Sequence, residues 1–525
     1  MKKIFLFACA AVIMLSAFSQ DFNEWESCTS IMVGKKASAD GSVMTSHTCD
    51  GGYRTWMRIE PAVEYKNDTT VSIYKGILKT ETPTDGRNVS KTGEIFQPAM
   101  KTYAFLNTAY PCLNEKQLAI GETTVSGRPE LINPDGLFYI EELERIVLQR
   151  CTTAREAIKL IGELVKQYGY ADAGECLTIA DKKEVWLLEI FGEGKEKIGG
   201  VWAAQRVPDD HVGVSANYSR IGKIDLKNKD YFMASDNVKD VAKKLGYWNG
   251  TDDFVFYKAY NKEGHKPFAI REYFILSSLA PSLSLKYDVD ELPFSVKPEK
   301  KVSVRDVIRL YRETYENTEW DMTKNLLVDK KINDSVTEKV KSPYSNPWMT
   351  GDMIKMLNSI DPDNVKFQRT VAVAWCSYSF IVQLRDWLPD EVGGVAWFAL
   401  DNPGESPRFP IFCGTEKLPD LFNVCGQYRF RTDAALWWYR RANRLATVKW
   451  QTTRKTIEEN VKHFEDKAFD ELPLLEQKVK QAMLNGDHKL ASKLVTDYTN
   501  DFTRATLQKW WELGDQFWGI FGKSF

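Results

Sequence analysis

The chain has 525 residues, of which 43% are hydrophobic and 12% aromatic, enough apolar material for a large core in one big unit or two fused ones. Its formal net charge of −2 gives no sign of the basic surface that nucleic-acid binding requires. Five histidines without the spacing of zinc ligands argue against a metal site, and we predict no metal and no other cofactor.

Residues 1–19 have the pattern of a secretion signal. Met1-Lys2-Lys3 is basic, and the apolar run from Ile4 to Ala17 is too short for a permanent membrane span. Small residues at Ala17 and Ser19 predict cleavage before Gln20. We therefore expect a secreted or periplasmic protein, and no later apolar segment is long enough to be transmembrane.

Residues 20–27 form a polar leader between the predicted cleavage site and Cys28. The leader is either a disordered N-terminus or a propeptide, and the residues leave both interpretations open. Removal of a propeptide would make Cys28 the first residue of the chain. A thiol and an α-amine would then share one residue, giving a nucleophile with its own base of reference pKa about 7.7–8.0.

A hairpin is predicted at this new start. Residues 28–33 and 43–50 have the pattern of strands around a turn at Ala39-Asp40-Gly41. An antiparallel hairpin carries the start of its first strand beside the end of its second, so Cys28 should lie near His47 and Asp50. A purely structural hairpin has the same pattern.

The rest of the chain predicts groups of strands separated by helices. Strands are expected at 106–108 and 113–124 with a turn at 114–116, then at 176–181, 184–189, 202–207, 211–217, 370–384 and 392–400. Helices are expected at 138–149, 154–168, 306–316 and through 433–525, where the tryptophans suit a core better than a carbohydrate platform. This order predicts a layered sandwich of helices and sheets, not a doubly wound parallel sheet.

Several motifs together resemble one known family. They are Cys28-Thr29-Ser30, Asp40-Gly41-Ser42, Gly121-Glu122-Thr123-Thr124, 202–210, Ser215-Ala216-Asn217, 293–298, Leu388-Pro389-Asp390 and 393–398. From Cys28 to the region of Trp437, the chain resembles the dipeptidase A family of N-terminal-nucleophile (Ntn) cysteine hydrolases, relatives of penicillin V acylase and choloylglycine hydrolase. The resemblance implies an α+β fold of the αββα type, with 28–430 as the peptidase domain and 431–525 as a helical region packed on it.

The resemblance also implies the catalytic residues. Cys28, freed by processing, would be the nucleophile, Asp50 the partner of its amine and Asn217 the oxyanion donor. The relatives have an Arg-x-x-Asp sequence on the second strand, and His47 stands at the place of that arginine. Arg54 could partly substitute for it.

Dipeptides above all, and other short peptides, are the implied substrates. A dipeptide has a free amine that requires a carboxylate, for which Glu122 is the candidate, and a free carboxylate that requires an arginine or a helix N-terminus. As an acid near the end of an apolar strand, Glu122 could equally be a solvated edge residue. Thr124 stands where the amidase relatives have asparagine, and Arg271 corresponds to a later arginine of theirs.

Two other functions remain open at this point. An amidase of the bile-salt hydrolase or penicillin V acylase type would use the same nucleophile with a larger apolar pocket. A non-catalytic secreted binding protein would use the tryptophan-rich C-terminal region and would not need Cys28. The sequence leaves the oligomeric state open, a homo-oligomer included.

Overall fold

The computed structural model describes residues 27–523 apart from Glu196. The predicted secretion signal and all leader residues except Ser27 lie outside the described residues. Across the described chain, no helix has both the length and the apolar character needed to cross a membrane.

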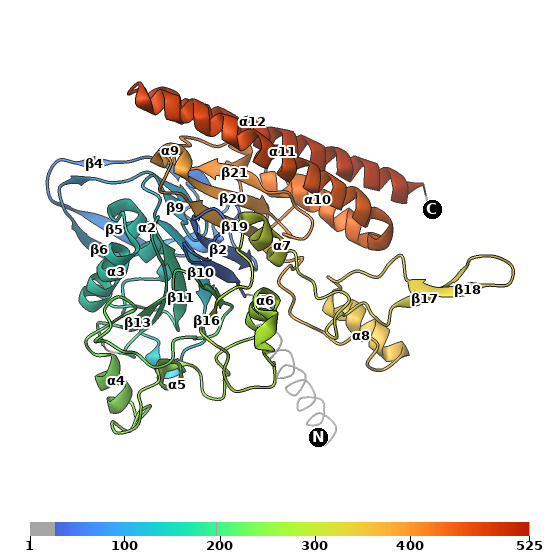
Figure 1. Ribbon diagram of the computed structural model, residues 1–525. Coiled ribbons are helices and arrows are strands. Elements are labelled where there is room, and N and C mark those ends of the chain that lie inside the picture. Colours follow the sequence, from blue (N-terminus) through green and yellow to red (C-terminus); the bar gives the residue numbers. More distant parts are fainter. Residues whose placement is uncertain (1–26, 196, 524–525) are drawn as a thin grey trace, which may run out of the picture.

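Two antiparallel sheets form the centre of the molecule (Figure 1). The first has seven strands in the order β16 (Ser295–Val296), β14 (Val212–Ser215), β1 (Ser30–Val33), β2 (Val43–Asp50), β19 (Cys376–Leu384), β20 (Gly394–Leu400) and β21 (Phe409–Phe412). The second has eight, in the order β15 (Phe232–Ala234), β13 (Val201–Arg206), β12 (Val185–Phe191), β11 (Glu175–Ala180), β10 (Ala119–Thr124), β9 (Leu113–Asn114), β8 (Phe105–Asn107) and β3 (Arg58–Glu60).

The two sheets face each other closely where β2 lies over β10 and β11. The hydroxyls of Thr45 and Thr178 form a hydrogen bond of 2.6 Å between the sheets. A Cβ atom on Gly121 would lie 2.3 Å from the carbonyl oxygen of Ser46, so only glycine fits there. This close approach brings side chains of β2 and β10 together, which is the basis of the site described below.

Helices cover the outer face of each sheet. α2 (Ile140–Arg150) and α3 (Ala154–Tyr168) pack on the eight-stranded sheet, whereas α7 (Val304–Tyr311), α10 (Ala435–Val448) and α12 (His488–Gly522) pack on the seven-stranded one. α11 (Trp450–Leu484) lies against α10 and α12 (Figure 1). The layers therefore follow in the order helix, sheet, sheet, helix, and the predicted αββα sandwich is confirmed.

The remaining helices and strands are short. They are the helices α4 (Val238–Lys244), α5 (Phe256–Tyr260), α6 (Ile270–Leu279), α8 (Gly351–Ile360) and α9 (Asp390–Gly393), and the strand pairs β4 (Glu64–Tyr65) with β7 (Met100–Lys101), β5 (Thr69–Lys75) with β6 (Ser90–Gln97), and β17 (Leu327–Lys331) with β18 (Thr337–Lys341). Among them, α6 matters most for the site, since its first turn carries Arg271.

The predicted first hairpin is confirmed. Val33 of β1 pairs with Met44 of β2, and Thr29 bridges to Thr48. The strands predicted at 202–207 and 211–217 are also present as β13 and β14, but they belong to different sheets. The turn between them therefore carries the chain from one layer to the other.

Two predicted boundaries were wrong. The helix predicted at 306–316 is α7, which begins after Ser303, whose hydroxyl accepts a hydrogen bond from the Asp306 N–H. It ends at Tyr311, and Tyr315 and Asn317 follow with φ of 61° and 64°, outside the helical region. The strand predicted at 370–384 begins only at Cys376, because residues 370–375 bond to loops instead of to a neighbouring strand.

The tryptophans of the C-terminal helices mostly pack internally. Trp510 is fully buried and donates to Asn443 over 3.0 Å, and the rings of Trp438 and Trp511 lie 4.9 Å apart. Trp518, by contrast, is 66% exposed. The division of the chain at residue 430 stays a prediction.

Candidate active site

Cys28 lies just before β1, 1% exposed, at the meeting point of several elements. His47 and Asp50 come from β2, and Glu122 from β10 in the opposite sheet. Asn217 follows the end of β14 with a left-handed φ of 72°, a conformation that asparagine tolerates better than most residues. The structure thus gathers residues that lie far apart in the sequence around one thiol.

Asn217 and Arg271 hold the backbone of Cys28. The Cys28 N–H donates to Asn217 Oδ1 over 2.8 Å, and Arg271 donates to the Cys28 carbonyl and, over 3.0 Å, to the Thr29 hydroxyl. Arg271 also donates to Asn217 Oδ1 over 2.9 Å, which fixes the direction of that amide. The Asn217 Nδ2 donates over 2.8 Å to the carbonyl of Thr124, and because Nδ2 has two hydrogens it can make a second bond.

Asp50 is fully buried, and only one of its two carboxylate oxygens has hydrogen-bond partners in the described chain. Its Oδ2 accepts from the Thr48 hydroxyl over 2.9 Å and from Arg369 over 2.6 Å. Its Oδ1 has no hydrogen-bond partner within residues 27–523. Its backbone carbonyl accepts from the Ser27 N–H over 3.2 Å, so Asp50 lies beside the peptide bond that joins Ser27 to Cys28.

Arg369 is the site residue that sequence reasoning missed. It lies in the irregular segment before β19, and its guanidinium bonds both Asp50 and Ser27. No local motif marks it, and the only available signal was its charge directly before the segment predicted as a strand, 370–384.

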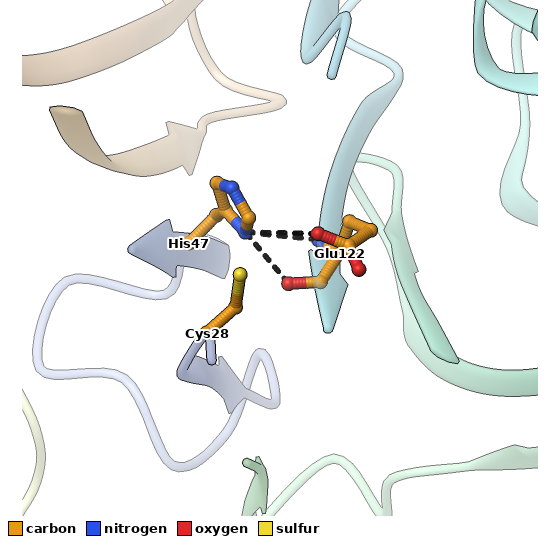
Figure 2. A group of neighbouring side chains, drawn as sticks. All are labelled: Cys28, His47 and Glu122. Carbon is orange, nitrogen blue, oxygen red and sulfur yellow. Dashed lines mark hydrogen bonds and ion pairs between the residues drawn. The ribbon is translucent and has the colours of Figure 1, made fainter. Parts of the chain in front are cut away.

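His47 forms a trio with Cys28 and Glu122 (Figure 2). The His47 Nδ1 lies 2.6 Å from the Glu122 carbonyl oxygen, so it carries the hydrogen and donates. Its Nε2 has no partner in the described part of the chain. Burial lowers the pKa of His47 to about 3, so the ring is neutral near pH 7 and does not provide the positive charge of the relatives' arginine.

The same trio is the group of side chains best placed to hold a metal ion within residues 27–523. One ligand-type atom from each of Cys28, His47 and Glu122 lies within 4.8 Å of the others, and thiolate, imidazole and carboxylate together suit zinc. However, the imidazole nitrogen nearest Glu122 already donates to a carbonyl. The arrangement therefore fits a hydrogen-bonded cluster better than a metal centre.

Burial also keeps the Cys28 thiol protonated. Desolvation, followed by the charge of Glu122, raises the pKa of this thiol well above its usual value. Desolvation likewise raises the pKa of Glu122, whose Oε1 accepts from the Thr124 hydroxyl over 3.1 Å. With Ser27 still attached, Cys28 has no α-amine, so its thiol lacks the base that a free N-terminus would provide.

The structure does not bring Arg54 into this site. Its guanidinium stacks 3.5 Å from the Trp56 ring and donates to the Trp56 carbonyl, Asn107 and Thr108. Asn107 ends β8 in the eight-stranded sheet and Thr108 follows it, and the expected substitution for the arginine of the relatives is not seen. Arg369 lies beside Asp50 instead.

A group of buried acids continues from Glu122 into the layer under α2. Glu175 of β11 lies near Glu122, and Glu141 and Glu144 of α2 are also buried. Neither carboxylate oxygen of Glu144 has a partner in the described chain, and burial raises its pKa well above 4.5. Ionising this group costs stability, because a charge would stand unpaired in the interior.

Replacing Glu144 with glutamine is expected to raise the melting temperature more near pH 8 than near pH 5. Above the usual pKa of 4.5 the unfolded chain loses its proton while the folded chain keeps it, so rising pH lowers the free energy of unfolding. The loss is up to about 1.4 kcal/mol per pH unit until the folded-state pKa is reached. Melting temperatures of the wild-type protein and the Glu144→Gln variant between pH 5 and pH 8 measure this difference. Glu338→Gln, on an exposed strand, is the control, and equal gains at both pH values would contradict the explanation.

Comparisons with known proteins agree with the resemblance. Residues 27–463 match peptidase family C69. The probable dipeptidase of Latilactobacillus sakei is 28% identical over 410 residues, which cover 76% of each chain. The probable dipeptidase B of Lactococcus lactis subsp. lactis (strain IL1403) is 27% identical over 437 residues, covering 77% of this chain and 78% of its own.

A solved structure, that of penicillin V acylase from Agrobacterium tumefaciens, aligns with 74% of this chain and 87% of its own at 12% identity. Its TM-score of 0.28 is too low to establish a common fold. The family match carries the assignment, since it spans far more than half of the sequence. The predicted resemblance is confirmed, and this chain is an enzyme of peptidase family C69.

Proposed function

We propose that this protein is a secreted or periplasmic cysteine dipeptidase whose nucleophile is Cys28 at a processed N-terminus. The observation that carries the proposal is the pair of acceptors prepared for a Cys28 amine. Asn217 Oδ1 already accepts from the Cys28 nitrogen, and the buried Oδ1 of the neighbouring Asp50 has no partner in the described chain. The relatives named as probable dipeptidases support the choice of substrate.

The chemistry follows from these positions. Roughly a tenth to a fifth of a free α-amine is neutral at pH 7, and this form takes the thiol proton of Cys28. The thiolate attacks the peptide carbonyl, whose oxygen gains the negative charge and accepts a hydrogen bond from the second N–H of Asn217 Nδ2. The α-ammonium, held by Asp50, then protonates the departing amine. Water cleaves the thioester, releases the first amino acid and restores the thiol.

Glu122 is the proposed partner of the substrate's free amine. It is fully buried, it lies within 4.8 Å of the Cys28 and His47 ligand atoms, and its Oε2 has no hydrogen-bond partner in the described structure. A cation entering here would meet a desolvated carboxylate, which binds it far more strongly than a solvated one would. Asp50 is committed to the Cys28 amine, so Glu122 is the better-placed acid.

Acetylating the amine of a good dipeptide substrate is therefore expected to lower kcat/KM by at least about tenfold, or 1.4 kcal/mol. Glu122→Gln should narrow this gap, because the amide cannot ion-pair with an ammonium. Steady-state rates with both substrates and both enzymes measure the effect. Faster cleavage of glycine-conjugated bile acids or penicillin V than of any dipeptide would favour the amidase alternative, whose acyl groups carry no amine.

A further inference from the structure

Arg369 presents one edge of its guanidinium to Ser27. Its Nε donates to the Ser27 hydroxyl and its Nη2 to the Ser27 carbonyl, each over 2.8 Å. Two parallel N–H donors on one edge form the fork that binds the two oxygens of a carboxylate. In this structure the two oxygens of one serine occupy that fork.

Processing before Cys28 would remove both of these partners at once. Arg369 would keep its bond to Asp50 and its bond to the neighbouring Thr370 carbonyl, but the Nε–Nη2 edge would lose both oxygens of Ser27. The side chain is 11% exposed, so its charge is largely desolvated and its fork is held in place by Asp50. The charge of Arg369 stays paired with Asp50, and processing frees the Nε–H and one Nη2–H, a pair of donors that fits the two oxygens of a carboxylate.

Processing does not free a pair of donors on Arg271, whose Nε alone lacks a partner in the described chain. Arg271 is buried, and its Nη donors are bound by Cys28, Thr29, Ala216 and Asn217, all of which remain after processing. It is a positioning residue for the nucleophile. Arg369 is the arginine of this site whose partners change when the leader is lost.

We propose that Arg369 binds the α-carboxylate of the dipeptide, in the place that Ser27 occupies before processing; this inference rests on the proposed function. Glu122 near the thiol and Arg369 beside the Ser27–Cys28 bond then mark the two ends of the substrate. A substrate bound by its amine at one end and its carboxylate at the other must match one fixed length, and each further residue adds up to about 3.5 Å. Arg369 would thus select dipeptides over longer peptides and over amidated ones.

The test compares a good dipeptide with its C-terminal amide. The full-length chain is used, and rates are normalised to the fraction whose intact mass corresponds to a start at Cys28. The wild-type enzyme should prefer the free carboxylate by at least about tenfold in kcat/KM, the loss expected for one charge-assisted pair. Arg369→Gln should bring the ratio near one, mainly by slowing the dipeptide, and Arg369→Lys should lie between, because it keeps the charge but not the fork.

The ratio of kcat/KM for the dipeptide to kcat/KM for its amide distinguishes carboxylate binding by Arg369 from a structural role. A residue that acted only through Asp50 would lower both rates equally and leave the preference unchanged, which would overturn the proposal. Arg305→Gln, which removes an arginine paired with Asp466 on the outer helices, is the matched control and should leave the ratio unchanged.

Equal rates for the two substrates in the wild-type enzyme would also overturn the proposal, while leaving dipeptidase activity intact. If the wild-type enzyme cleaved neither substrate, the proposed function itself would be contradicted. If the Arg369→Gln variant is not processed, the ratios measured for the wild-type enzyme and for Arg369→Lys still test the proposal.

Discussion

Replacing Cys28 with alanine is expected to abolish dipeptide hydrolysis, because no other thiol within residues 27–523 has the same surroundings. Cys28 is the cysteine whose nitrogen is held by Asn217 and whose sulfur lies with His47 and Glu122. Active wild-type protein should have the intact mass of a chain that begins at Cys28. The change removes the covalent step itself, so the loss should approach the full rate enhancement.

Cys49→Ala is the matched control for this experiment. Cys49 is also buried on β2, but its side chain lies against Tyr378, and it should fold and keep substantial activity. A fully active enzyme that still begins at Gln20 would contradict the mechanism, since the Cys28 nitrogen would be an amide. Unchanged hydrolysis by Cys28→Ala would show that Cys28 is not the nucleophile, whereas no hydrolysis by the wild-type protein would favour the non-catalytic binding protein.

The layered fold could be predicted because its elements follow simple periodic patterns. In α3, the apolar residues Ala157, Ile158, Ile161, Leu164 and Val165 are spaced for one helical face, and the structure buries all of them. The first hairpin could be predicted because Ala39-Asp40-Gly41 favours a reversal of the chain, and in the structure it lies in the connection between β1 and β2, with Gly41 at a φ of 83°. Local patterns of this kind need no knowledge of distant residues.

The site itself could be predicted only in part. The hairpin indicated Cys28 near His47 and Asp50, but nothing local showed that residue 369 would return to the same place. The expectation for Arg54 failed for the same reason. A position four residues beyond Asp50 is close in sequence, yet the chain turns away there and the guanidinium stacks on Trp56.

Replacing Asn217 with alanine is expected to lower kcat by roughly 10²–10³-fold, the cost of one lost oxyanion donor. The second Nδ2 hydrogen is the donor in question, and Arg271 and the Thr124 carbonyl hold the amide in the orientation that presents it. Because the same side chain also holds the Cys28 nitrogen, the loss should appear in kcat more than in KM. Steady-state kinetics on mature chains measure both.

Asn217→Gly separates this chemistry from backbone strain. At φ 72° an alanine is strained by about 1–2 kcal/mol, whereas glycine adopts this conformation freely. Both variants lack the amide, so both should lose kcat to a similar extent if the amide is the donor. A glycine variant with unimpaired kcat would show that the alanine result came from the distorted loop, and Asn217 would no longer be a catalytic residue.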